Sequence, residues 1–321
     1  MMEDGKFKAI QVPSSIKSSS DPSLTAPQRL IAGENGNVLD YGQFLSITEE
    51  DAANLSFYSA PASKEMYRNF LDWLFATFGV EELDFRRGLI AKLNLKSGSK
   101  VLITGCGFGD DVLLCMESVG DLGEVHAQDL SKEMVHAAAR AYPAKNALYT
   151  ISNALDLPYR DRYFDGVFHF GGINLFGDMA RAVKEMERVC KIGGRVVFGD
   201  EGIAPHLRGT EYGKVAISNI DIWKASAPLE KLPSNAEEIS LSYVLGNCFY
   251  IIEFSVGEGL PKMNIDVEHK GLRGGTARSR YYGRIEGVTI SAKEKLYQAA
   301  RARNTSVHRL LSDLIDEAIP D

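Results

Sequence analysis

The stretch from Val101 to Asp111, VLITGCGFGDD, constrains the fold of this chain more than any other. A short apolar run is followed by three alternating glycines and then by an amphipathic run, which indicates a strand, a tight turn and a helix. Glycine permits positive φ in such a turn and lets the backbone approach a ligand closely. The start of the helix presents free N–H groups to that ligand. The stretch therefore predicts a ligand site between a strand and a helix.

The number of residues between this turn and the next carboxylate, that of Asp129, is typical of nucleotide-binding folds. Asp129 is expected at the end of the next strand, about twenty residues beyond the glycines, where a carboxylate can accept hydrogen bonds from both hydroxyls of a ribose. Together, the glycine turn and Asp129 predict a site for a nucleoside.

Four segments in this order resemble motifs of the class I S-adenosylmethionine-dependent methyltransferases, in the style of the ubiquinone/menaquinone-methyltransferase-like group. The glycine turn resembles their GxGxG motif, and QDLSKEM (128–134) resembles the segment whose acid binds ribose and whose next residues flank adenine. Two later motifs of the family resemble SNALDLPYRDRYFDGVFHF (152–170) and ERVCKIGGRVVFGDEG (187–202). The resemblance implies S-adenosyl-L-methionine as the cofactor.

The resemblance assigns a cofactor site residue by residue. Its members are Gly105, Cys106, Gly107, Gly109, Asp129, Leu130, Met134, Asn153, Ala154, Leu155 and Gly171. Ile103 stands where the family usually has an acid, so the methionine amino group needs another partner, such as a backbone carbonyl near Gly105 or Gly171, or the cofactor differs slightly. Asn153 replaces the usual Asp, and its amide can still donate to and accept from an adenine edge.

Methyl transfer from a sulfonium depends mainly on alignment of the acceptor, so no catalytic triad is expected. Candidates for a general base follow the last two expected parallel strands: His169, Glu201 and His206. Imidazole and carboxylate groups suit proton transfer from a phenol, enol or amine. The alternatives are a packed strand histidine, a solvated loop carboxylate and a surface loop histidine. The resemblance implies a small-molecule acceptor; a macromolecular acceptor would suggest a recognition domain, for which the C-terminal tail is the only candidate.

The element pattern predicts an α/β fold with a doubly wound, Rossmann-like, mostly parallel sheet of seven strands and an antiparallel last hairpin. The expected parallel strands are 100–106, 124–130, 147–154, 164–171 and 194–200. Helices are expected over Thr210–Trp223 and Ala236–Leu245, and the hairpin over Phe249–Val256 and Met263–His269. An NAD-dependent dehydrogenase would instead end on a parallel strand.

Four regions are predicted along the chain: a flexible Ser- and Pro-rich leader (1–30), an N-terminal helical cap (31–95), the S-adenosylmethionine-binding domain (96–270) and a tail (271–321). The cap is expected to cover the mouth of the sheet, with Tyr58 and Tyr67 as candidates to reach inward. Its longest helix is predicted to bury one face, made of Met66, Phe70, Trp73, Leu74 and Phe78.

The tail differs in charge from the rest, with nine Lys and Arg against six Asp and Glu. A short strand over Ile285–Thr289 and helices over Ala292–Arg303 and Val307–Ile319 resemble the ribbon-helix-helix fold, in which two chains interlock. The resemblance implies a homodimer through the tail. DNA contact through arginines such as Arg278, or a helical hairpin packed on its own chain, are the alternatives.

Composition bounds the remaining possibilities. A formal charge of −7 argues against nucleic acid as a partner of the whole chain. The four cysteines lack metal-ligand spacing, so they are predicted to be buried thiols in a reducing compartment, with no metal site. No apolar run is long enough for a membrane span, and a cytoplasmic protein is expected.

Two functions of different classes fit these features. The favoured one is an S-adenosylmethionine-dependent methyltransferase of a small molecule, dimerised by its tail. The other is a non-catalytic S-adenosylmethionine-binding protein, regulatory or in contact with DNA through its C-terminal module, which the missing acid at Ile103 motivates.

Overall fold

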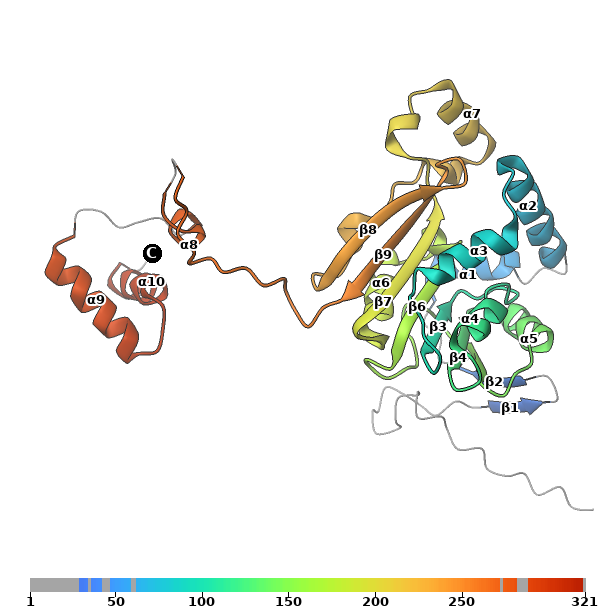
Figure 1. Cartoon of the computed structure of the whole chain (residues 1–321), viewed down its shortest axis with the longest axis horizontal. Coiled ribbons are helices and arrows are strands. Elements are labelled where there is room, and N and C mark those ends of the chain that lie inside the picture. Colours follow the sequence, from blue (N-terminus) through green and yellow to red (C-terminus); the bar gives the residue numbers. More distant parts are fainter. Residues whose placement is uncertain are drawn as a thin grey trace, which may run out of the picture. The chain divides into compact units, whose positions relative to one another are not determined.

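The computed structural model describes residues 29–33, 36–41, 47–58, 62–271, 274–281 and 288–319. These residues contain a sheet of nine strands in the order β1-β2-β5-β4-β3-β6-β7-β9-β8 (Figure 1). The strands are β1 (Arg29–Gly33), β2 (Gly36–Asp40), β3 (Lys100–Thr104), β4 (Glu124–Asp129), β5 (Ala147–Ile151), β6 (Phe164–Phe170), β7 (Cys190–Glu201), β8 (Ala236–Val244) and β9 (Phe249–Val256). The order reverses at β3, between β4 and β6, so a ligand crevice is expected beyond the carboxyl ends of these strands.

The doubly wound, mostly parallel α/β class predicted from the sequence is confirmed. Strands β2 to β7 run parallel to one another, while β8 and β9 add an antiparallel edge. At the other edge β1 pairs antiparallel with β2, which makes the sheet two strands wider than expected. The predicted leader lies outside the described residues, except that Arg29 and Leu30 begin β1. Both added strands lie almost wholly in the stretch expected to be a helical cap.

The structure contains the predicted antiparallel hairpin and its strand Phe249–Val256, but the second strand of the hairpin was predicted at the wrong residues. It joins β8 to β9, so the helix expected over Ala236–Leu245 is wrong, as is the strand expected over Met263–His269. The physical reason is the turn: Leu245, Gly246 and Asn247 all have positive φ and connect two adjacent antiparallel strands directly. Apolar side chains at alternate positions of β8 have the period of a strand.

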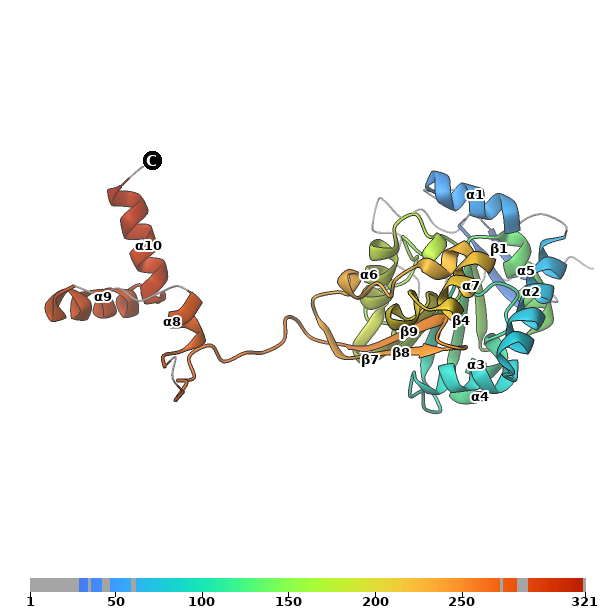
Figure 2. The same cartoon turned by 90° about the horizontal axis from the view of Figure 1, so that it is seen from above.

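Helices cover both faces of the sheet (Figure 2). The helices of the unit that contains the sheet are α1 (Glu49–Tyr58), α2 (Ser63–Phe78), α3 (Glu82–Ala91), α4 (Val112–Val119), α5 (Lys132–Ala141), α6 (Met179–Val189) and α7 (Glu211–Asn219). Three further helices, α8 (Ala277–Tyr281), α9 (Ile290–Ala302) and α10 (Val307–Ala318), belong to a second unit. Along β3, Val101 and Ile103 pack in the core formed with α3, α4 and α5, while Leu102 packs in the core formed with α6. This alternation fixes β3 at the centre of the fold.

The face that the cap helix α2 buries overlaps the predicted one in part: Leu74 is buried, and Phe70 and Phe78 are partly buried against the same cluster. Leu71, Leu74 and Phe75 are the buried apolar residues, in a cluster with residues that follow β7 and begin β9. Met66 is 49% and Trp73 is 39% exposed. The buried face is therefore rotated about the helix axis relative to the predicted one, because the residues after β7 and at the start of β9 decide which side of α2 is covered.

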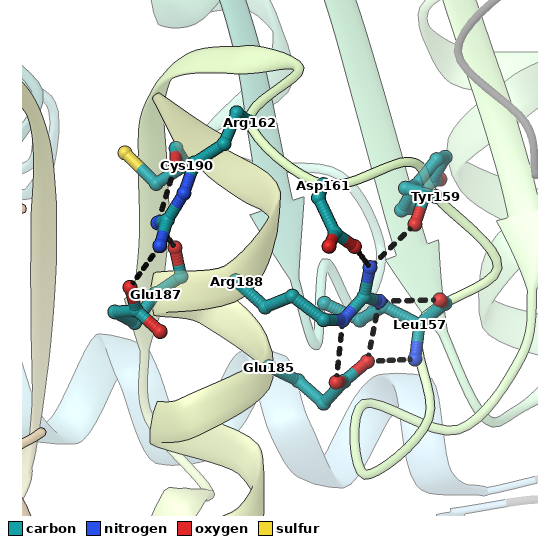
Figure 3. A network of polar contacts seen from close by, with 8 residues as sticks. All are labelled: Leu157, Tyr159, Asp161, Arg162, Glu185, Glu187, Arg188 and Cys190. Atoms are coloured by element: carbon teal, nitrogen blue, oxygen red, sulfur yellow. Dashed lines mark hydrogen bonds and ion pairs between the residues drawn. The ribbon is translucent and has the colours of Figure 1, made fainter. Parts of the chain in front are cut away.

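One arginine fixes the loop after β5 to α6 (Figure 3). Arg188 donates to both carboxylate oxygens of Glu185, at 2.7 Å each, and to Asp161 at 2.6 Å. It also donates to the backbone oxygens of Leu157 and Tyr159, at 2.9 and 2.8 Å. Since five bonds converge on one guanidinium, the loop has little freedom.

Residues from Lys262 onward form a second compact unit. Its two predicted helices are confirmed as α9 and α10, and Ser306 caps α10. Thr289 caps α9 and Ile290 begins it, so no strand is present at Val288–Thr289, and residues 282–287 of the expected strand lie outside the described residues. The ribbon-helix-helix resemblance stays a prediction.

Candidate cofactor and acceptor site

A cavity lies at the carboxyl ends of the central strands, under the cap helices α1 and α2. Ten predicted site residues line it: Gly105, Gly107, Asp129, Leu130, Met134, Asn153, Ala154, His169, Gly171 and Glu201. Tyr58 and Tyr67 line it as well. Four other predicted residues, Cys106, Gly109, Leu155 and His206, are not part of the lining. The structure thus brings together most of the predicted site, whereas His206 lies on an exposed turn after β7.

The three glycines of the turn differ in what surrounds them, although all have positive φ: +60° at Gly105, +54° at Gly107 and +92° at Gly109. A Cβ at Gly105 would lie 2.9 Å from the His169 ring, and one at Gly109 would lie 2.9 Å from Ala138. A Cβ at Gly107 would meet no atom within 4 Å. Two of the glycines therefore permit packing, and Gly107 leaves open space at the cavity.

Asp129 is held in place by main-chain donors. Its Oδ2 accepts the N–H of Gly107 and its Oδ1 accepts the N–H of Ser131, each at 2.9 Å. Burial raises the pKa of Asp129, and these N–H groups act against that shift. Each oxygen keeps a further lone pair, so the carboxylate can accept two more hydrogen bonds from a ligand.

Replacing Asp129 with alanine is expected to lower the affinity for S-adenosylhomocysteine at least tenfold, because a charged acceptor of two hydroxyls is lost. Isothermal titration of the folded variant measures the change. Asp121→Ala, in an exposed turn before β4, is the control and is expected to bind like the unaltered chain. Equal affinities of the two variants would mean that no ribose contacts Asp129.

His169 lies beneath the glycine turn. Its Nδ1 is 2.8 Å from the backbone oxygen of Thr104, so Nδ1 carries the hydrogen and Nε2 is unprotonated. Burial lowers the pKa of His169, which keeps the ring neutral. The ring also packs against Phe176 and Gly105. This environment suits a residue that supports the turn more than one that receives a proton.

Glu201 and Asp200 are adjacent carboxyl groups at the end of β7. Asp200 is fully buried and accepts the N–H groups of Gly172, Asn174 and Glu201, at 3.1, 2.6 and 2.9 Å. Glu201 lines the cavity, and its pKa is raised well above the ordinary value by burial and by the charge of Asp200. Since Asp200 is fixed by three donors, Glu201 is the group of the pair that can exchange a proton with a ligand.

Two charged residues of the cavity were missed by sequence reasoning. Arg86 of α3 is 4% exposed, lies 3.0 Å from the carboxylate of Asp111 and lines the cavity beside Tyr67. Asp51 of α1 is 5% exposed and lines it beside Asn153. The sequence signals a helix start at Thr48 through the pattern Thr48-x-x-Asp51, but it contains nothing that places Asp51 or Arg86 in the cavity.

Part of the chain is similar in sequence to known methyltransferases. Residues 102–198 match the family model described as a methyltransferase domain. Demethylmenaquinone methyltransferases are similar: that of Geobacillus sp. (strain WCH70) is 33% identical over 118 residues, and that of Lysinibacillus sphaericus (strain C3-41) is 34% identical over 118 residues. Each match covers 36% of this chain and 50% of the relative, so the chain spans about half the length of the curated relatives it matches.

Among solved structures, phosphoethanolamine N-methyltransferase 2 of Haemonchus contortus, in complex with S-adenosyl-L-methionine, has a similar fold. Its TM-score is 0.50 at 14% identity, and the match covers 63% of this chain and 60% of that one. The fold, the glycine turn and the carboxylate at the end of β4 together are those of a Rossmann-like domain. Over residues 102–198 the chain is thus similar to a methyltransferase domain, its fold is that of the class I S-adenosylmethionine-dependent methyltransferases, and these likenesses support S-adenosylmethionine as the cofactor.

In the part of the chain that the structure describes, no helix has the length and apolar character that a membrane crossing requires.

Proposed function

We propose that this protein transfers the methyl group of S-adenosylmethionine to a small-molecule acceptor. The observation that carries the proposal is a single cavity with two functional ends. At one end, Asp129 is fixed beside the open space at Gly107; at the other, Glu201 carries a raised pKa. When bound, the cofactor supplies a methyl carbon activated by the sulfonium.

The residues of the chain fit the nucleoside part of such a cofactor. Asp129 is suited to the ribose hydroxyls, and Leu130 and Met134 offer apolar surface to the base. Among the described lining residues Arg86 is the cation, but Asp111, Glu82 and Asp110 already pair with its guanidinium at 3.0, 2.8 and 3.5 Å, so it has no unpaired charge for the methionine carboxylate. Ile103 is 2% exposed and apolar, so the amino group must bind elsewhere.

The acceptor end favours a mainly apolar molecule with one weakly acidic group. Its described lining includes the apolar side chains of Phe70, Leu71, Leu74 and Phe249, and the carboxyl group of Glu201. In the proposed reaction, the chain aligns the acceptor with the methyl group, excludes water, and takes the acceptor proton on the carboxylate of Glu201.

Two measurements test the proposal in sequence. Titration with S-adenosylhomocysteine tests cofactor binding, and transfer of a radioactive methyl group to a panel of phenols and quinols, demethylmenaquinol included, tests turnover. Failure of the chain to bind the nucleoside would refute the proposal. Binding without transfer to any of these acceptors would favour the non-catalytic regulatory function, which gel retardation of DNA at moderate salt would then examine.

The proposed dimer depends on the second unit. Of its described apolar residues only Ala300 and Leu310 are buried, while Leu314, Ile315 and Ile319 of the α10 region are 39%, 49% and 72% exposed. Helix α9 carries three cations against one carboxylate, and α10 carries three carboxylates against one cation. The helices are therefore self-complementary in charge, as a two-fold interface requires.

Replacing Leu314 and Ile315 together with glutamate is expected to convert the full-length dimer to a monomer, because four charges would enter an apolar interface. Light scattering coupled to gel filtration measures the mass. Leu122→Glu, at a residue that is 85% exposed in the first unit, is the matched control and is expected to remain dimeric. A monomeric unaltered chain, or an unchanged mass in the double variant, would contradict this view of the tail.

A further inference from the structure

Asp51 is a buried carboxylate to which the proposed function gives no role. It lies in the first turn of α1, is 5% exposed and lines the cavity. In the described part of the chain its donors are three neutral N–H groups: Gly177 N–H to Oδ1 at 3.2 Å, Thr48 N–H to Oδ2 at 3.2 Å, and the Asn153 side chain to Oδ2 at 3.4 Å. A carboxylate offers about four acceptor positions, so Oδ1 can accept one more hydrogen bond.

The neighbouring Asn153 has its own acceptor already in use. Its Oδ1 accepts the N–H of Leu155 at 2.9 Å, and its amide group donates to Asp51. Asn153 therefore offers an amide whose oxygen already accepts a hydrogen bond, where the family usually has a carboxylate. It follows the end of β5, next to the strand that carries Asp129. A ligand donor at this end of the cavity would find its charged acceptor on Asp51.

The cavity lining near Asp129 includes Leu130 and Met134, which follow it in the chain, and Asn153 and Ala154, which follow the neighbouring strand β5, so a base attached to the ribose would be expected beside these residues. Adenine carries one exocyclic amino group with two N–H donors. We propose that Asp51 accepts a hydrogen bond from this amino group, so that a carboxylate from the cap helix α1 reads the base in place of an acid at the end of β5. This inference rests on the proposed cofactor and adds a specificity-determining residue to it.

Asp51 also has a structural role that the test must separate. The Thr48 hydroxyl accepts the N–H of Asp51 at 3.0 Å while Asp51 accepts the N–H of Thr48, a reciprocal cap for α1. Loss of the cap would loosen α1 and weaken any ligand equally. Loss of the amino-group contact would weaken only ligands that carry the amino group.

The test compares S-adenosylhomocysteine with S-inosylhomocysteine, whose base has an oxygen acceptor in place of the amino donor, by isothermal titration on the full chain. The unaltered protein is expected to prefer the adenosyl compound. Asp51→Asn is expected to bind the adenosyl compound about tenfold more weakly, since a charged acceptor is lost. The same variant is expected to bind the inosyl compound as well as the unaltered protein or better, because an amide can donate to the oxygen.

Three further variants sharpen the result. Thr48→Val removes the cap hydroxyl, keeps the side-chain shape and is expected to leave the ratio of the two affinities unchanged. Asp129→Ala is expected to weaken both compounds by a similar factor, because both contain ribose. Asn153→Asp, added to Asp51→Asn, restores a carboxylate at the same place and is expected to recover the preference for the adenosyl compound.

An unchanged ratio in Asp51→Asn, or an equal loss for both compounds, would overturn the inference while leaving the proposed cofactor intact. Absence of binding of either compound to the unaltered protein would instead refute the proposed function itself.

Discussion

Replacing Gly107 with valine is expected to abolish binding of S-adenosylhomocysteine, by a factor of more than about a hundred, while the chain still folds. The position has a φ of +54°, and a Cβ there would meet no protein atom within 4 Å. The added side chain would enter the cavity beside Asp129, whose Oδ2 accepts the Gly107 N–H. Isothermal titration gives the affinity, and circular dichroism shows whether the fold persists.

The matched control is Gly79→Val. Gly79 has a similar φ of +61°, and a Cβ there also meets no atom within 4 Å, but the residue ends α2 away from the cavity lining. Both variants carry the strain of a branched residue in the left-handed region, of about 1–3 kcal/mol. Loss of ligand binding in Gly107→Val alone would therefore come from occupied space. Equal binding of the two variants would contradict the proposed position of the nucleoside.

The sequence predicted the central part of the site correctly because each feature there depends only on residues that are close together in the chain. The turn at 105–109 needs positive φ at each glycine, and only the backbone between β3 and α4 is required to form it. The position of Asp129 follows from the end of β4, and Ser131 caps α5 by accepting the Met134 N–H at 3.3 Å. Each of these features spans a few residues, so a single sequence contains the whole signal.

The missed features depend on contacts between distant segments. Asp51 meets Asn153 across 102 residues, and Arg86 meets Asp111 across 25 residues. Neither pair leaves a mark on hydrophobic periodicity, because both members are charged or polar. The hairpin of β8 and β9 was misplaced for a different reason. Short amphipathic runs fit both a strand and a helix, and the turn that decides between them is four residues long, from 245 to 248.

Glutamine in place of Glu201 is expected to lower the rate of methyl transfer about a hundredfold, within the range that a general base contributes, and to leave S-adenosylhomocysteine affinity nearly unchanged. The carboxylate receives a proton only when it is ionised, so the rate of the unaltered enzyme rises with pH through the raised pKa of Glu201. The variant loses this rise. A pH profile of single-turnover transfer measures both effects, and an unchanged profile would exclude Glu201 as the base.

Stability provides a second measurement of the same group that needs no acceptor. Burial beside Asp200 raises the pKa of Glu201, so the folded chain keeps a proton that the unfolded chain releases. The stability it contributes is full below the ordinary glutamate pKa and is lost as pH rises through the raised one. The free energy of unfolding of Glu201→Gln, measured in urea, is therefore expected to fall less steeply as pH rises.

The control for this measurement is a second buried glutamate with the opposite shift. Burial acts to raise the pKa of Glu253, but Lys92 and Arg195, at 2.9 and 2.8 Å, outweigh burial and lower it. Its contribution is present above the ordinary glutamate pKa and is lost as pH falls. Glu253→Gln is thus expected to change the free energy of unfolding at pH values below the ordinary glutamate pKa. Glu201→Gln is expected to change it at pH values above that pKa. If both variants changed the same side, Glu201 would be an ordinary paired carboxylate and would not be suited to accept the proton of a methyl acceptor.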